Sequence, residues 1–71
     1  MKKTISVGDI VEILENEIVH GRLKANERIV ETEISKRFNV SRTPIREAMR
    51  TLESNGYISF IRYKGWKVKE L

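Results

Sequence analysis

The chain has 71 residues, of which 39% are hydrophobic and 34% are charged, and its net charge is +4 at pH 7. This balance predicts one small globular domain with a marginal core and argues against a disordered tail. It has no cysteine and one histidine, so disulfides, thiol catalysis and a protein-built metal site are not expected. No apolar run reaches the roughly 18 residues of a membrane span, and no secretory segment opens the chain. We expect a cytoplasmic protein without a metal or cofactor.

The charge is distributed unevenly along the chain. Residues 1–21 contain two lysines against four acidic residues, whereas residues 41–71 contain seven basic residues against three acidic ones. A molecule polarised in this way has a basic side that suits a phosphate backbone.

The first half of the chain predicts two helices. After a loose basic lead-in at residues 1–5, hydrophobic residues recur at three- and four-residue steps and predict an amphipathic helix over about 7–20. Gly21 is expected in the left-handed conformation after it, and His20 near its C-terminus, where positive charge is favoured. Residues 22–30 predict a turn with at most a short strand. A second helix is predicted over 31–38, where Val30 cannot cap the start but Glu31 suits the positive end of the dipole.

A tight turn then leads into the most informative helix, predicted over about 42–55 and ended by Gly56. Asn39 tolerates the left-handed backbone of the turn, and Ser41 is expected to cap the helix through its hydroxyl. Pro44 falls in the first turn, where its missing N–H costs little.

Two faces of this third helix carry the functional prediction. Four hydrophobic residues share an arc of about 100°: Ile45, Ala48, Met49 and Leu52. Three arginines recur at four-residue steps about 100° away from that arc: Arg42, Arg46 and Arg50. The hydrophobic arc should set the roll of the helix and aim the arginines outward. The alternative is a solvated charged face with partial pairing, because Glu47 and Glu53 each lie three residues from Arg50.

Residues 57–70 predict a β-hairpin with positive charge at its tip. Residues 57–61 are rich in β-branched and aromatic side chains, residues 62–65 form a basic turn with a glycine, and residues 66–69 alternate. Trp66 is expected to pack over the hairpin and third helix rather than to stack on a nucleobase. For Tyr63, at the tip, both roles stay open.

The order of helix, short strand or turn, helix, turn, helix and hairpin indicates a winged helix-turn-helix, mainly α with a small β-hairpin. In such a fold the third helix enters the DNA major groove, and arginine suits guanine because its planar fork donates two hydrogen bonds. Several side chains could contact phosphate: Ser41, Thr43, Arg50, Arg62 and Lys64. Guanidinium tips that were buried or locked into internal ion pairs would require this role to be abandoned. No catalytic base–orienter pair is evident, so an enzyme is not expected.

Residues 10–68 resemble the N-terminal DNA-binding domain of GntR-family bacterial transcription regulators, most closely the FadR-like branch. The resemblance rests on five segments: Ile18–Leu23, Glu31–Phe38, Val40–Ala48, Leu52–Gly56 and Gly65–Val68. The chain departs from the usual family pattern at four places: Thr32 replaces a DNA-contacting arginine, Val30 a capping serine, Ala25-Asn26 a Pro-Gly pair, and Tyr63 a frequent wing glycine.

The resemblance implies that a homodimer binds double-stranded DNA at a pseudo-palindromic operator. It places Arg42, Thr43 and Arg46 among the recognition contacts, Ser41 near phosphate, and the turn from Arg62 to Gly65 in the wing. It also implies a C-terminal domain that binds an effector metabolite and holds the dimer. We therefore expect a DNA-binding fragment of a longer repressor or activator, with a free-standing small regulator as the alternative. The fragment alone should be a monomer or weak dimer.

Two other functions remain as alternatives. The same fold could be a protein–protein interaction module whose arginine face meets an acidic partner. It could also bind single strands or RNA through Tyr63 and Trp66. Sensitivity of binding to salt and preference for duplex over single strands distinguish the three.

Overall fold

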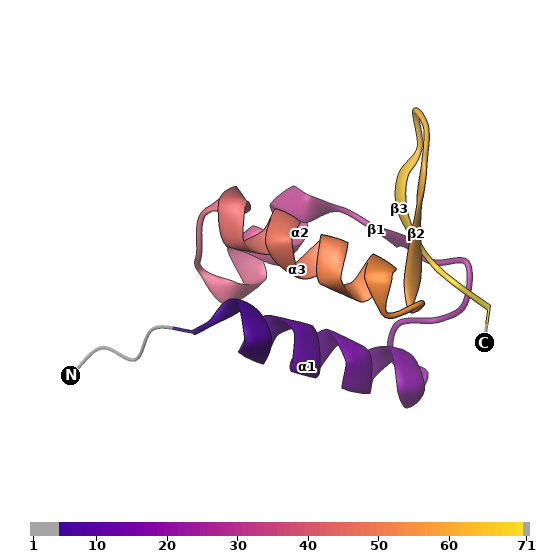
Figure 1. The fold of residues 1–71 in the computed structure, drawn as a ribbon, viewed down its shortest axis with the longest axis horizontal. Helices are drawn as coiled ribbons and strands as arrows, with labels where there is room; N and C mark the ends of the chain where they lie inside the picture. The colour runs from indigo at the N-terminus through magenta and orange to yellow at the C-terminus, as the bar shows by residue number, and fades with distance from the viewer. Residues whose placement is uncertain (1–4, 71) are drawn as a thin grey trace.

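The computed structural model describes residues 5–70 and contains three helices and a small antiparallel sheet. Figure 1 shows α1 along one side of α3, with α2 on the other side and the hairpin rising at the far end of α3, away from α1. The elements follow in this order: α1 (Val7–Val19), β1 (Arg28–Ile29), α2 (Glu31–Phe38), α3 (Arg42–Ser54), β2 (Ile58–Ile61) and β3 (Gly65–Val68). The winged helix-turn-helix prediction is confirmed, and the basic lead-in falls largely outside the described residues.

The start of α1 is set by a reciprocal cap that the sequence analysis did not identify. The amide of Asp9 donates to the Ser6 hydroxyl, and the amide of Ser6 donates to the Asp9 carboxylate, each at 3.1 Å. This pair satisfies two amides that would otherwise lack a partner in the first turn. At the other end the helix stops at Val19, one residue before the predicted end, and Gly21 takes the predicted positive φ of 78°.

The turn between α2 and α3 has the predicted left-handed residue. Asn39 has φ 56° and ψ 48°, and its amide and that of Val40 donate to carbonyls in the last turn of α2. The predicted capping by Ser41 is wrong in one respect: Ser41 occupies the N-cap, but its hydroxyl makes no capping hydrogen bond. Pro44, three residues later, has no N–H, so one of the two amides that usually donate to such a cap is missing.

The wing is a three-stranded sheet rather than a hairpin alone. The strands are ordered β1-β3-β2, and both neighbours pair with β3 in antiparallel fashion. Residues 22–30, for which a turn and at most a short strand were predicted, contain the two-residue strand β1. This strand places Ile29 opposite Trp66. The predicted hairpin over 57–70 is confirmed with shorter strands joined by residues 62–64.

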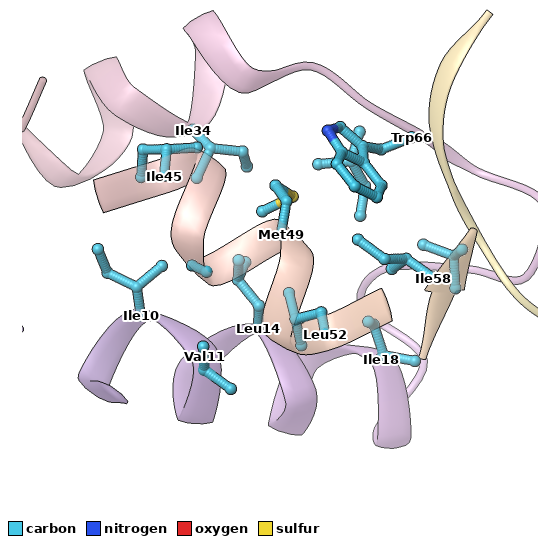
Figure 2. Packing of buried hydrophobic residues seen from close by; sticks show 13 residues of the cluster. Ile10, Val11, Leu14, Ile18, Ile34, Ile45, Met49, Leu52, Ile58 and Trp66 are labelled. Atoms are coloured by element: carbon cyan, nitrogen blue, oxygen red, sulfur yellow. The ribbon is translucent and has the colours of Figure 1, made fainter. Parts of the chain in front are cut away.

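Helices and sheet share one hydrophobic core (Figure 2). The apolar arc predicted for α3 is fully buried, since all four of its residues have no exposed surface. Trp66 is 8% exposed and lies in this same cluster, where its ring meets Phe60 edge-on with centroids 5.0 Å apart. The predicted packing role of Trp66 is confirmed. The thirteen buried residues are Ile10, Val11, Leu14, Ile18, Ile29, Ile34, Ile45, Ala48, Met49, Leu52, Ile58, Trp66 and Val68.

Candidate nucleic-acid interface

The outer face of α3 carries the three predicted arginines. Arg42, Arg46 and Arg50 are all exposed, while the hydrophobic arc of the same helix is buried against α1, α2 and the sheet. The roll of the helix is therefore fixed by apolar burial, as the sequence predicts. Ser41 and Thr43 are exposed at the start of the helix, beside the backbone amides of its first turn. These amides and hydroxyls are suited to hydrogen-bond with an anion.

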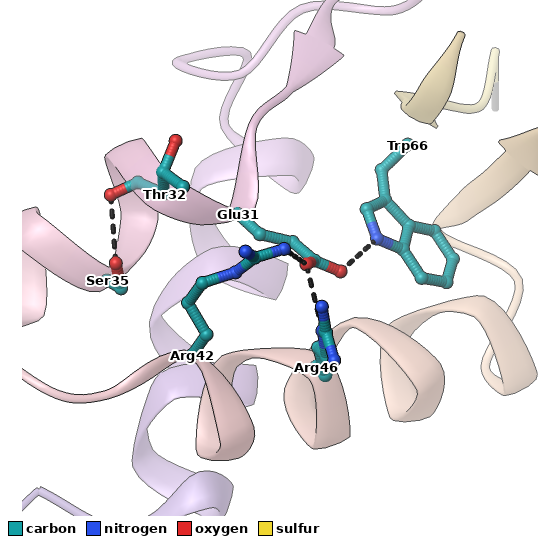
Figure 3. Close-up of polar contacts among 6 residues, drawn as sticks. All are labelled: Glu31, Thr32, Ser35, Arg42, Arg46 and Trp66. Carbon is teal, nitrogen blue, oxygen red and sulfur yellow. Dashed lines mark hydrogen bonds and ion pairs between the residues drawn. The ribbon is translucent and has the colours of Figure 1, made fainter. Parts of the chain in front are cut away.

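One carboxylate, that of Glu31, lies against this arginine face (Figure 3). Its Oε1 accepts a hydrogen bond from Arg42 Nη2 at 3.1 Å and from Arg46 Nε at 3.3 Å. Its Oε2 accepts from the indole Nε1 of Trp66 at 2.8 Å. Glu31 is the first residue of α2, whereas Trp66 belongs to β3, so the carboxylate joins α2, α3 and the wing.

These contacts correct the expectation that the arginines would be free of internal ion pairs. Arg42 and Arg46 are both paired with Glu31, whose role the sequence analysis limited to the helix dipole. The pairing leaves their side chains 52% and 57% exposed. Each guanidinium has five N–H donors and uses a single nitrogen on Glu31. Both terminal amino groups of Arg46 thus stay available to a ligand.

The same contacts keep Glu31 charged. Desolvation by burial raises the pKa of Glu31, but hydrogen bonds from Trp66, Arg42 and Arg46 together outweigh it and leave the pKa below its ordinary value. The side chain is 17% exposed, so the charge is held close to the arginines with little water around it. Glu31 is therefore a fixed anion beside an otherwise basic helix face.

The wing turn holds the second group of predicted residues. Arg62, Tyr63 and Lys64 are exposed, and the amide of Lys64 closes the turn on the carbonyl of Ile61 at 2.9 Å. Tyr63 is 90% exposed, and the guanidinium of Arg62 lies over its ring at 5.1 Å. Gly65 and Tyr63 both have positive φ, 85° and 68°. A glycine at the position of Tyr63 would suit that backbone better.

Arg50 differs from the other two arginines of α3. In the part of the chain that the structure describes, it forms no ion pair, so the alternative pairing with Glu47 or Glu53 is absent. Thr32, at the position where a family arginine is usual, accepts a hydrogen bond from the Ser35 hydroxyl through its backbone carbonyl at 2.9 Å.

A second ion pair was also not anticipated from the sequence. Arg37 of α2 donates to Glu17 of α1, with Nη1 to Oε1 at 2.8 Å and Nη2 to Oε2 as a second, parallel contact. The two residues of this ion pair lie twenty positions apart, and no local sequence pattern predicts such a pairing. It lies between the two helices that flank α3 and removes Arg37 from the set of free basic residues.

The described residues contain no cluster of side chains suited to hold a metal ion. Nor does any helix among residues 5–70 have the length and apolar character needed to cross a membrane.

Comparison with known proteins identifies a matching family and similar regulators. Residues 7–68 match the family described as bacterial regulatory proteins, gntR family. The chain is 45% identical over 58 residues to the uncharacterized HTH-type transcriptional regulator YdhC of Bacillus subtilis (strain 168), a match that covers 82% of this chain and 26% of that protein. It thus spans about a quarter of the length of this relative.

Two solved structures share the fold. A GntR-family transcriptional regulator from Pseudomonas syringae pv. tomato has a TM-score of 0.86 and 35% identity, over 92% of this chain and 27% of that one. The DNA-binding domain of AraR, solved in complex with operator ORE1, has a TM-score of 0.82 and 27% identity, over 93% of this chain and 82% of that one.

Proposed function

Because the chain belongs to the GntR family of bacterial regulatory proteins, we propose that it binds duplex DNA in a sequence-specific manner to control transcription. The function is one of binding without catalysis, in the cytoplasm. The AraR domain, which has the same fold, was solved on operator DNA. In this chain α3 enters the major groove and the wing lies on the adjacent backbone or minor groove.

One observation supports this function above all others: a single helix buries one face completely and presents three exposed arginines on another. Arg42 and Arg46, nearest the start of the helix, are suited to read base edges, since recognition helices do so with their N-terminal residues. The remaining predicted residues position the phosphate backbone: Ser41, Thr43, Arg50, Arg62, Lys64 and Gly65.

The regulator as a whole is proposed to be longer than the domain. We propose that a further C-terminal domain binds an effector metabolite and brings two copies together on a pseudo-palindromic operator. Two-fold symmetry of this kind would place the two recognition helices one turn of DNA apart, roughly 34–36 Å. The isolated domain then makes the contacts of one half-site and binds more weakly than the dimer.

The test is selection of bound sequences from a random duplex pool, followed by binding measurements on the selected duplex, a scrambled duplex and the matching single strand. The proposal predicts preference for the selected duplex, and affinity that falls steeply as salt rises. Preference for the single strand would contradict duplex recognition. Absence of duplex binding at low salt would instead favour a protein-interaction module with an acidic partner.

A further inference from the structure

Glu31 is the one acidic side chain of the described residues that pairs with the arginines of α3. An anion in this place works against non-specific binding, because it repels phosphate and cancels part of the attraction of Arg42 and Arg46. Its three hydrogen bonds and low exposure show that the carboxylate is built into the fold.

The geometry of the contact with Arg46 suggests what the anion does. Glu31 accepts from Nε, the nitrogen nearest the helix, and this restrains the guanidinium while its outer edge stays free. A long side chain that is immobilised before binding loses less entropy when it forms a bidentate pair with a base. An arginine without such a partner can equally reach a phosphate, which carries no sequence information.

The carboxylate is itself held in place from the side of the wing. Trp66 donates to Oε2 at 2.8 Å, and its ring is packed in the core. Oε2 therefore points toward β3 and Oε1 toward the arginines (Figure 3). A surface carboxylate that contacted one arginine alone would not be held in a single orientation in this way. Rotation of the carboxylate would break a partly buried hydrogen bond.

We propose that Glu31 is a specificity-determining residue that positions Arg46 and Arg42 for base recognition and lowers non-specific affinity. The proposal rests on the proposed function of duplex binding and names the residue that sets its selectivity. Glu31 acts through the two arginines and makes no contact with DNA itself.

The variant Glu31→Gln tests this positioning, because an amide has only one acceptor oxygen. Either the arginines or Trp66 would then face an NH₂ donor. The matched control is Glu33→Gln in the same first turn of α2, which makes the same change of charge at an exposed carboxylate without a hydrogen bond or ion pair in the described region. Glu31→Asp is the second variant, since it keeps the charge but shortens the reach.

The measured quantity is the ratio of affinities for a selected duplex and a scrambled one. Loss of even about 1 kcal/mol of discrimination lowers this ratio about fivefold. We expect the affinity ratio to fall in both Glu31→Gln and Glu31→Asp. Because Glu31→Asp keeps the charge, its binding should depend on salt as that of the wild type does. In Glu33→Gln both affinities should rise together and leave the ratio unchanged. A ratio that falls no further in the Glu31 variants than in Glu33→Gln would overturn the proposal.

A measurement without DNA separates this proposal from the function on which it rests. In the free protein, the Nε–H proton of Arg46 should exchange with solvent more slowly than that of Arg50 in nitrogen-15 NMR spectra. Glu31→Gln should reduce the difference, because an amide oxygen is a weaker acceptor than a carboxylate and can face the arginines only when the NH₂ faces Trp66. Equal exchange in the wild type would overturn the positioning role even if duplex binding is specific. A wild-type chain with no sequence preference would overturn both the function and the selectivity assigned to Glu31.

Discussion

Replacement of Arg46 by alanine should flatten sequence preference and leave the fold intact. The side chain is 57% exposed, and Glu31 keeps its hydrogen bonds from Arg42 and Trp66 when Arg46 is removed. The loss of Arg46 should therefore change the free energy of unfolding by less than about 1 kcal/mol. A bidentate contact to a base is worth about 1–3 kcal/mol of discrimination, which corresponds to about a five- to 150-fold fall in the affinity ratio.

Lys64→Ala is the informative contrast, because Lys64 lies exposed in the wing turn with no ion pair among the described residues. Its loss should weaken binding to every duplex about equally and reduce the salt slope by about 0.9. Between about 50 and 200 mM salt, a change of this size makes the fall in affinity about 3.5-fold smaller than in the wild type.

Fluorescence anisotropy with a selected duplex and its scrambled counterpart, at four salt concentrations, measures both quantities at once. Thermal melting of each variant shows whether the fold is retained. The assignment of base reading to α3 would be wrong if Arg46→Ala kept the wild-type ratio. It would also be wrong if Lys64→Ala changed the ratio and left the slope unaltered.

Three further predictions concern stability. The hydrogen bond from Arg37 lowers the pKa of Glu17. The pair therefore stabilises the fold fully above the ordinary glutamate pKa of about 4.3, and this contribution is lost as pH falls through the lower folded value. Glu17→Gln should cost about 1 kcal/mol at neutral pH but little in strong acid, and the same loss of unfolding free energy in urea at both pH values would contradict this. Tyr63→Gly should relieve about 1 kcal/mol of left-handed strain at φ 68° and raise the melting temperature by several degrees. An unchanged or lower melting temperature would contradict this and would show that the contact between Arg62 and Tyr63 outweighs the strain. Met49→Ala, at a fully buried site, should cost about 2–5 kcal/mol in urea unfolding, a large part of the roughly 4–11 kcal/mol expected for a domain of this size; a cost below about 1 kcal/mol would show that the core collapses around the gap.

Local patterns were sufficient to predict the elements of this fold. The three- and four-residue spacing of hydrophobic side chains predicted all three helices, because burial of one face decides both where a helix forms and how it rolls. Asn39, Gly21 and Gly56 marked helix ends correctly, since each has the positive φ that such ends require. The hydroxyl of Ser41 makes no capping hydrogen bond, and Pro44 lacks one of the two N–H groups that could have donated to it.

Long-range contacts were beyond these patterns. Glu31 and Trp66 are 35 positions apart, and their hydrogen bond depends on how β3 lies against the start of α2. The ion pair between Glu17 and Arg37 likewise depends on the relative placement of two helices. One signal in the sequence could have pointed to Glu31: an acidic residue begins the helix that precedes the arginine-rich helix in a helix-turn-helix.

The role proposed for Glu31 would make selectivity depend on residues that do not contact the DNA. Two separate constraints act on Arg46: burial of α3 sets where its Cα lies, and the hydrogen bond to Glu31 restrains its guanidinium. Burial alone leaves a four-bond side chain free to sample several rotamers, including those that reach phosphate. Because Glu31 is in turn oriented by Trp66 of the wing, a change in the sheet can alter base preference through this hydrogen bond while the arginine face keeps its sequence. Comparison of wing variants with α3 variants should therefore show two routes to altered specificity, of which only one replaces an arginine.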